Sequence, residues 1–236
     1  MNMHGMGLFY YDWTYILIMI PCLILSLICS AKVKSSFSKY SQVTNSRRIT
    51  GAQAAQEVLT AHGVTGVRIE PVKGNLTDHF DPKSNVIRLS ESVYGATSVA
   101  AVGVACHEAG HAVQHAEGYV PNKIRSAIVP VANIGSRLSW IVLVIGMLLP
   151  VQYSFVITIG IVLFSASVLF TLITLPVEFN ASSRALATIK STNMLNPEEY
   201  SGAKKVLTAA AMTYVAAAAT SIMQLLRLLL IFNRRR

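Results

Sequence analysis

Long apolar runs on both sides of one polar stretch are the main pattern of this chain. The first run, from Trp13 to Ala31, is almost uninterrupted, and at about 1.5 Å per residue a helix of this length matches the thickness of a hydrocarbon core. The residues before it include no lysine or arginine, whereas a cleaved signal peptide begins with a basic segment. We therefore predict an uncleaved transmembrane anchor over residues 1–31.

The later apolar runs predict three more helices. The run from Leu138 to Leu175 is too long for one crossing and is interrupted at Pro150 to Ser154, so residues 128–175 are predicted as a transmembrane hairpin. The pattern does not fix where its first arm begins between residues 128 and 137. The last run, Val206 to Phe232, predicts a C-terminal apolar helix over 206–236 that either crosses the bilayer or lies along its surface.

The polar stretch, residues 49–127, predicts a small α+β unit beside the bilayer. A unit of this size has a marginal core, so we expect helices that follow the hairpin to complete it. Its predicted elements are a helix from the N-cap Thr50 to Gly63, strands over Val67–Val72 and Val86–Ser90, a loop over Lys73–Ser84, and a helix capped by Thr97 or Ser98 and ended by Gly118 and Pro121.

Composition and charge favour a membrane protein of mainly α structure. Hydrophobic residues make up 53% of the 236 residues and charged residues 13%, about half of the share in a typical soluble domain. The formal net charge of +9 suits an anionic bilayer rather than nucleic acid, because the basic residues cluster beside the apolar runs. Three cysteines, two of them inside an apolar run, make no disulfide framework.

The charges around the first run predict its orientation. No basic residue precedes the run, and five follow it before the first acid, Glu57. The positive-inside rule then places the N-terminus outside and residues 32–127 in the cytoplasm, as a domain of a multi-pass plasma-membrane protein. If the last run also crosses, its Arg234–Arg236 end lies outside, against this rule. The five basic residues are Lys32, Lys34, Lys39, Arg47 and Arg48.

One motif carries the candidate chemistry. His107-Glu108-Ala109-Gly110-His111 is an H-E-x-x-H sequence in the middle of a predicted helix, which is the context that distinguishes the motif from a chance match. Residues four apart lie on one helix face, so His107 and His111 can bind one Zn²⁺. Glu108 is rotated from them by about 100° and can accept a proton from the attacking water without binding the metal. The motif predicts a metal hydrolase with one Zn²⁺ per chain.

A catalytic zinc needs a third protein ligand, and two residues are candidates. His115 is next on the same face but lies about 6 Å further along the helix axis, which favours a role as a polar neighbour. Glu178 follows the hairpin, where an acid beside an apolar run is costly unless it is paired or binds a metal. We predict a helix over residues 176–205, bent or restarted at Pro176, that carries it. The residues alone leave Glu178 open between a zinc ligand, an acid at a helix N-terminus and an ion pair with Arg184.

Four segments together resemble the YugP-type family of bacterial membrane proteins, which are described as neutral zinc metallopeptidases. The resemblance covers nearly the whole chain and extends more distantly to HtpX-like and CAAX prenyl-endopeptidase membrane proteases. It implies a zincin-like (gluzincin-type) catalytic domain at the membrane face, with His107, His111 and Glu178 as zinc ligands and Glu108 as general base. The segments are LTDHFDP (76–82), VIRLSE (86–91), VACHEAGHAVQHAEGY (104–119) and LPVEFNASSRAL (175–186).

One position departs from the HtpX-like pattern, in which an aspartate four residues after the ligand glutamate supports a ligand histidine. Ser182 occupies that position here and brings no charge. The supporting carboxylate is therefore missing or replaced, and Asp78, Asp81 and Asn180 are the candidates.

The predicted function is a membrane-anchored zinc endopeptidase that acts on membrane or membrane-proximal proteins. An extended peptide would pair with the strand Val86–Ser90 if that strand has a free edge. The tetrahedral intermediate needs a further positive or hydrogen-bonding group, for which Arg184, His115 and His79 are candidates.

Two other functions compete with this prediction. A non-catalytic membrane scaffold with a structural zinc would have no use for Glu108, which binds no metal. A zinc transporter would carry ionisable residues through its spans, but the segment from Ser139 to Leu175 has no charged side chain. Cys106 points off the metal face and is predicted to be a small buried residue rather than a nucleophile.

Overall fold

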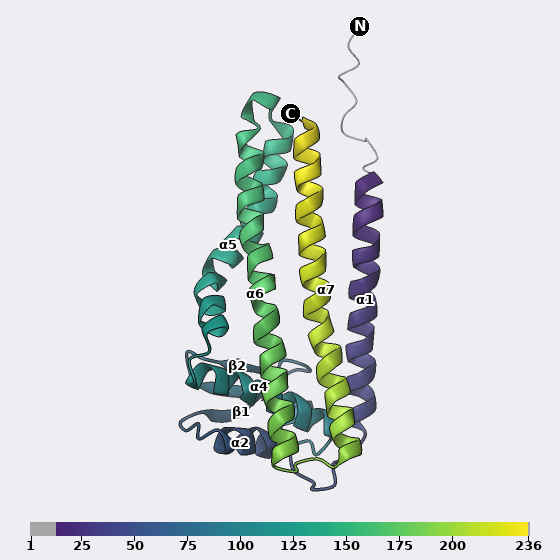
Figure 1. The fold of residues 1–236 in the computed structure, drawn as a ribbon, viewed down its shortest axis with the longest axis vertical. Coiled ribbons are helices and arrows are strands. Elements are labelled where there is room, and N and C mark those ends of the chain that lie inside the picture. The colour runs from purple at the N-terminus through teal and green to yellow at the C-terminus, as the bar shows by residue number, and fades with distance from the viewer. Residues whose placement is uncertain (1–12, 236) are drawn as a thin grey trace.

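Four long helices stand side by side, and a small α+β unit packs at one end of them (Figure 1). The structure, a computed structural model, describes residues 13–235, so the first twelve residues of the predicted anchor lie outside the described residues. The long helices are α1 (Trp13–Ser41), α5 (Val120–Leu148), α6 (Phe155–Ser191) and α7 (Pro197–Arg235).

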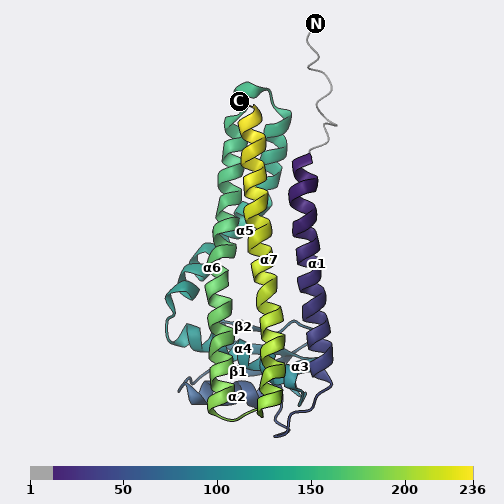
Figure 2. The same cartoon turned by 45° about the vertical axis from the view of Figure 1, so that its right-hand side comes forward.

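All four long helices are long and apolar enough to cross a membrane. In the most apolar window of each, only 11% to 28% of the residues are buried inside the protein, so most apolar side chains face outward, as a lipid environment requires. The start of α1, the α5–α6 turn and the end of α7 lie at one end, and the α+β unit lies at the other (Figures 1 and 2). By length and composition, the C-terminal helix is thus a candidate span.

The helices differ from the apolar runs in where they begin and end. α1 continues past Ala31 to Ser41, because its polar second half packs on α7. α6 passes through Pro176 without a break, so no separate helix forms over residues 176–205; its neighbours α4, α5 and α7 hold both halves of α6 in line. A turn at Asn193, whose φ is 51°, then leads to α7.

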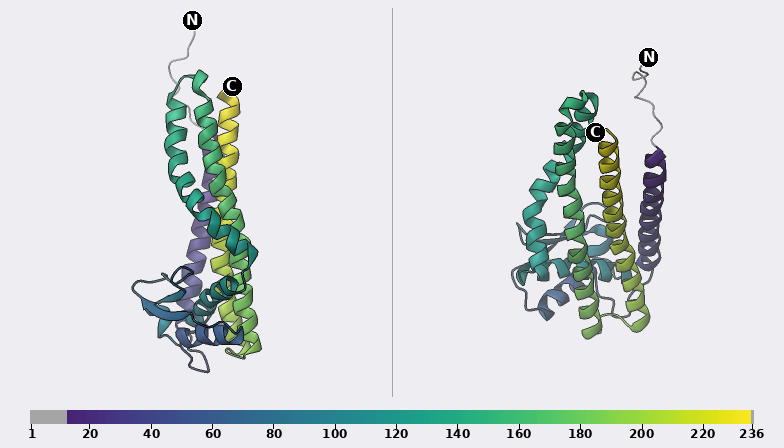
Figure 3. Two further views of the ribbon diagram at one scale, coloured as in Figure 1. Left: turned by 90° about the vertical axis from the view of Figure 1, so that its left-hand side faces the viewer. Right: turned by 45° about the horizontal axis from the view of Figure 1, so that its top comes forward.

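The hairpin forms as predicted, with an earlier start. α5 begins at Val120 because Pro121 occupies its first turn. The N–H that proline lacks would have no partner within the helix at this position. Pro130 lies inside α5, and the helix bends along its length (Figure 3). The predicted break appears as a short 3₁₀ turn, η2 (Val151–Tyr153), before α6 returns.

The α+β unit confirms most of the predicted elements and adds one strand. Thr50 forms a capping box at the start of the first helix, and Ser98 caps the helix that carries the motif. A three-residue strand occurs within the segment predicted as a loop, too short for its pattern to mark it. The elements are α2 (Gly51–Ala61), β1 (Arg68–Val72), β2 (His79–Asp81), β3 (Val86–Ser90), α3 (Glu91–Tyr94) and α4 (Val99–Ala116).

The extra strand changes which strand has a free edge. The sheet order is β1-β3-β2, with β1 parallel and β2 antiparallel to β3. The condition for peptide pairing along Val86–Ser90 is therefore not met, because both sides of this strand are paired. The free edges belong to β1 and β2.

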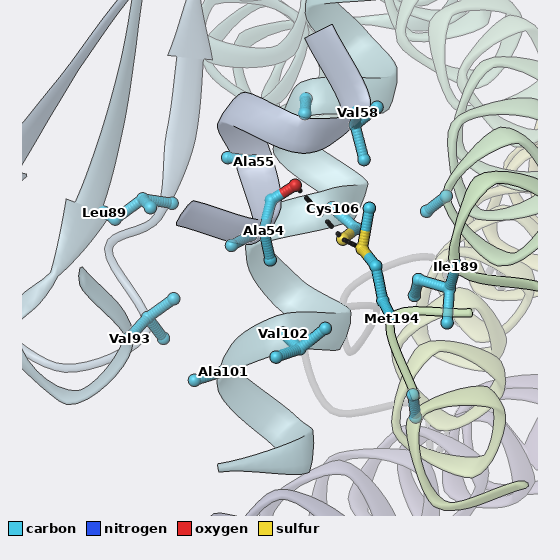
Figure 4. Packing of buried hydrophobic residues seen from close by; sticks show 14 of the residues in the cluster. Ala54, Ala55, Val58, Leu89, Val93, Ala101, Val102, Cys106, Ile189 and Met194 are labelled. Carbon is cyan, nitrogen blue, oxygen red and sulfur yellow. Dashed lines mark hydrogen bonds between the residues drawn. The ribbon is translucent and has the colours of Figure 1, made fainter. Parts of the chain in front are cut away.

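α4 forms the centre of the α+β core. Figure 4 shows Cys106 of α4 between Ala54 of α2 and Met194, which follows α6. Ile189, Met194 and Leu207 belong to this core, which confirms that helices after the hairpin complete it. Cys106 is fully buried, and burial together with the charge of Glu57 raises the pKa of its thiol, as expected for a packing residue.

Candidate metal centre

A close approach of α4 to α6 brings the motif to the hairpin. A Cβ on Gly110 would lie 2.6 Å from the carbonyl oxygen of Ala181, so only glycine fits at this position. Gly110 is one residue before His111, and Ala181 is three residues after Glu178. The two helices can therefore place His107, His111 and Glu178 around one point.

These three side chains are the one group of potential metal ligands found within residues 13–235. One ligand atom from each of them lies within 4.8 Å of the others. Oε2 of Glu178 is 3.3 Å from Nε2 of His107 and 3.5 Å from Nε2 of His111, and all three side chains are at most 15% exposed. His115 is not part of the group.

The geometry and the bonding of the group fit a zinc ion. Two ligands at about 2.0–2.1 Å from a tetrahedral zinc lie roughly 3.3 Å apart, close to the two separations found here. Oε2 of Glu178 is buried and has no hydrogen-bond partner in the described part of the chain. A buried carboxylate oxygen without a partner is costly, and a cation between it and the two imidazoles would remove that cost.

The far nitrogen of each imidazole is held by a polar neighbour. Nδ1 of His111 is 3.1 Å from Oε1 of Gln114, which can only accept, so in the neutral imidazole Nδ1 carries the hydrogen and Nε2 has its lone pair toward Glu178. Nδ1 of His107 is 3.0 Å from Oγ of Ser182, and the same tautomer makes that hydroxyl the acceptor. Ser182 thus contacts a histidine from the position where HtpX-like proteins have an aspartate, but without a charge.

Electrostatics around His111 are dominated by acids. Burial by itself lowers the pKa of His111, but the nearby carboxylates of Glu178 and Glu108 outweigh burial and hold that pKa above its ordinary value. The same negative charge that favours a proton on this imidazole also favours a metal cation beside it.

A cavity of about 300 Å³ opens on the group. Glu108 lines it together with both histidines and Glu178, so the motif glutamate and the three potential ligands face the same space. β2 borders the cavity on one side, and α5 and α7 close it on others. Its remaining lining residues are Asp78, His79, Phe80, Pro82, Asn122, Arg125, Ser126, Val129 and Tyr214.

The cavity contains two groups that the sequence prediction missed. Nη1 of Arg125 lies 3.7 Å from Oε1 of Glu178, and Nε of Arg125 is buried without a partner among the described residues. Tyr214 of α7 lines this cavity and a second one beside it. An arginine within an apolar helix is a signal that could have identified Arg125. Nothing in the alanine-rich sequence around Tyr214 distinguishes it.

The structure separates the residues proposed to stabilise the intermediate. His79 lines the cavity, and its Nδ1 is 2.8 Å from the carbonyl oxygen of Thr77. His115 packs on the ring of Phe80 at 5.7 Å between centroids. Arg184 does not line the cavity: it pairs with Glu117 at 2.6 Å and donates to Asn180.

The proposed replacements for the supporting carboxylate form their hydrogen bonds with other residues. Asp78 accepts bonds from Ser90, and Asp81 from Ser84 and Arg88, which lower the pKa of Asp81 below its usual range. Asn180 reaches His111 only through Gln114, a fully buried residue that donates to Asn180 and to the carbonyl of Val177. The sequence analysis predicted no role for Gln114, although its position three residues after His111 on one helix face was a usable signal.

The fold and the site together define a membrane protein with four candidate spans and a buried His₂Glu group. Residues 15–233 match the model of the family described as "Putative neutral zinc metallopeptidase", and the chain belongs to this family. It is 49% identical over 218 residues to a Bacillus subtilis (strain 168) protein named "Putative membrane protease YugP", covering 92% of this chain and 96% of that protein. No solved structure matches the chain. Both names describe a protease.

Proposed function

We propose that this protein is a membrane-anchored zinc metalloendopeptidase whose ligands are His107, His111 and Glu178. The observation that carries the proposal is the buried Oε2 of Glu178, which accepts no hydrogen bond within residues 13–235 and faces two imidazole nitrogens at zinc-like separations. An open cavity beside a three-residue ligand set is typical of catalytic zinc, whereas structural zinc sites are closed by four protein ligands. This difference favours the enzyme over a non-catalytic scaffold.

Glu108 is the proposed general base. It lines the cavity beside the ligands without belonging to the ligand group, so it can take the proton of the attacking water and pass it to the leaving amine. A zinc ion held here would supply Lewis-acid chemistry, activating a water molecule and polarising the scissile carbonyl. Arg125 and Tyr214 face the same space and replace Arg184 and His115 as the proposed donors to the developing oxyanion.

The proposed substrate is an extended peptide that lies along β2. β2 has a free side, and His79 and Phe80 from this strand line the cavity. Beside the metal group, a second cavity of about 150 Å³ is lined mainly by apolar residues of α1, α4 and α7, among them Phe37 and Leu207. An apolar cavity of about this volume can hold a benzene ring. One side chain next to the scissile bond is therefore expected to be apolar.

Cleavage sites in a denatured test protein check this preference. We expect leucine or phenylalanine at one position beside the cleaved bond to be enriched roughly tenfold over charged residues, the range that filling a small apolar pocket supplies. Mass spectrometry of the products gives the distribution. An equal frequency of charged and apolar residues at every position would contradict the proposed subsite.

The proposed orientation places the α+β unit and the metal group in the cytoplasm. The basic residues that follow Ala31 support it, and an even number of crossings then puts both ends of the chain outside. A reporter enzyme that is active only in the cytoplasm, fused after Arg236, is expected to be inactive, and the same reporter inserted in the exposed turn at Lys73 is expected to be active. The reverse pattern would invert the orientation.

Removal of the metal tests the function itself. The purified full chain is expected to contain one zinc per chain by elemental analysis and to hydrolyse an unstructured protein. A chelator should stop the hydrolysis, and added Zn²⁺ should restore it. Hydrolysis that persists in metal-free protein would reject the proposal.

A further inference from the structure

A basic groove lies between α1 and α7. It is on a different face of α1 from the face that lines the second cavity, the apolar cavity beside the metal group. It has a volume of about 560 Å³. We define it by four lysines and two of the hydroxyl residues between them: Lys32, Lys39, Lys204, Lys205, Ser36 and Thr208. α1 and α7 run side by side over this region (Figures 1 and 2), so the groove joins segments far apart in the sequence.

The charge of the basic groove is not balanced by the protein. None of the described residues that line it is acidic. Within the described part of the chain, none of its four lysines forms an ion pair, and Lys39 instead lies 5.6 Å from the centre of the Tyr40 ring. Four ammonium groups around one groove repel each other, and a bound anion would relieve that repulsion.

The position of the groove along the helices indicates where its ligand comes from. Lys32 directly follows the apolar run of α1, which ends at Ala31, and Lys204 and Lys205 directly precede the apolar run of α7, which begins at Val206. Both helices therefore change from polar to apolar at the level of the groove. In a membrane, this level is that of the lipid headgroups.

The apolar end of the groove continues toward the bilayer. Ala209 and Met212 line it beyond the lysines, and Met212 is exposed. A ligand that fills the groove must therefore be anionic at one end and apolar at the other. Its volume lies within the range of small-molecule sites.

We propose that the basic groove binds an anionic phospholipid, with its phosphate among the four lysines and the hydroxyls and an acyl chain along Met212. Lysine is a common phosphate ligand, and basic pockets between membrane helices on the cytoplasmic side are suited to anionic headgroups. The lipid would bridge α1 to α7. Because Val33 and Phe37 on another face of α1 line the apolar cavity beside the metal group, it would also hold one wall of that cavity in place. The binding itself does not depend on proteolysis.

Lipid retention by the full-length protein in detergent tests the site. After equilibration with phosphatidylglycerol or phosphatidylcholine, native mass spectrometry gives the fraction of protein that carries each lipid. We expect phosphatidylglycerol to be retained at least about tenfold more strongly than phosphatidylcholine, and the difference to fall as salt is raised. Equal retention of the two lipids would overturn the proposal.

Two variants of the groove and one matched control locate the effect. A fourfold variant, in which Lys32, Lys39, Lys204 and Lys205 are all replaced by alanine, should weaken retention of phosphatidylglycerol by nearly three orders of magnitude, at about fivefold per lysine. The variant Thr208→Phe keeps every charge but fills the groove, so it should also lose phosphatidylglycerol. A control variant removes the same charge from other parts of the chain and should retain phosphatidylglycerol. Its four substitutions are Lys34→Ala, Lys73→Ala, Lys83→Ala and Lys190→Ala. Equal losses in the two fourfold variants would show diffuse attraction and overturn the site.

A soluble competitor distinguishes a lipid from a free phosphate. Glycerol 3-phosphate carries a phosphate, as a monoester, without acyl chains and is expected to displace phosphatidylglycerol only at a concentration at least about a hundredfold higher. Displacement at equal concentration would assign the groove to a soluble phosphate and reject the phospholipid. Thr208→Phe alone decides the proposal if the fourfold variant does not fold, because it removes no charge.

Discussion

Replacement of Glu108 by glutamine is expected to abolish peptide hydrolysis and to leave the bound zinc unchanged. Glutamine has the same shape but cannot accept a proton from water, so the change removes the proposed base and little else. A positioned general base contributes typically 10²–10⁴-fold, and the loss in kcat should fall in or above this range. Because Glu108 lies outside the ligand group, zinc occupancy should stay at one per chain.

The measurement is kcat on an unstructured protein, with zinc content determined on the same sample. Glu91→Gln is the matched control: it makes the same change at an exposed acid of the α+β unit, and its activity should equal that of the unmodified protein. Activity retained by Glu108→Gln would remove Glu108 from the mechanism, and loss of zinc would show that it is a ligand.

Tyr214→Phe provides an informative comparison in the same assay. It removes the hydroxyl of a residue that lines the cavity and leaves Glu108 and the ligand group in place. If Tyr214 donates to the oxyanion, kcat should fall by about 10²-fold with KM little changed. An unchanged kcat would leave Arg125 as the proposed donor.

The sequence could predict the features of this protein that depend on local pattern. The helix caps at Thr50 and Ser98, the strand Val86–Ser90 and the hairpin break after Pro150 all follow from residues close together in the chain. The H-E-x-x-H motif is local as well, because both histidines and the glutamate lie on one helix turn. The same local reasoning predicted that a helix bends or restarts at Pro176, where packing of α6 against three helices keeps it continuous.

The features that sequence could not supply depend on contacts between distant segments. β2 is three residues long and becomes an edge strand only through its pairing with β3. Arg125 and Tyr214 reach the cavity because α5 and α7 pass beside α4 and α6, and neither residue belongs to a motif. Glu178 could be predicted only in part. An acid beside an apolar run is a signal in the sequence, but the close approach of α4 at Gly110 is needed to show that Glu178 lies opposite the two histidines.

Replacement of Glu178 by alanine is expected to remove zinc and to destabilise the protein, for two separate reasons. The change deletes one of three proposed ligands, and a loss of zinc affinity well above the 10–100-fold typical of outer contacts is expected. It also leaves Arg125, which lies 3.7 Å from the carboxylate, without a counter-charge in a candidate span. An unpaired, partly buried charge is destabilising even when no metal is present.

A second substitution separates these two effects. In the double variant Glu178→Ala with Arg125→Leu, the unpaired charge is gone, so thermal stability of the metal-free protein should recover while zinc affinity stays low. Zinc affinity is measured by competition with a metal-binding dye, and stability by the unfolding midpoint with and without zinc. Zinc should raise the midpoint of the unmodified protein and leave that of both variants unchanged, because a ligand stabilises only the state that binds it. If the alanine variant binds zinc as tightly as the unmodified protein, Glu178 is a structural ion-pair partner of Arg125 and the third ligand must be sought elsewhere.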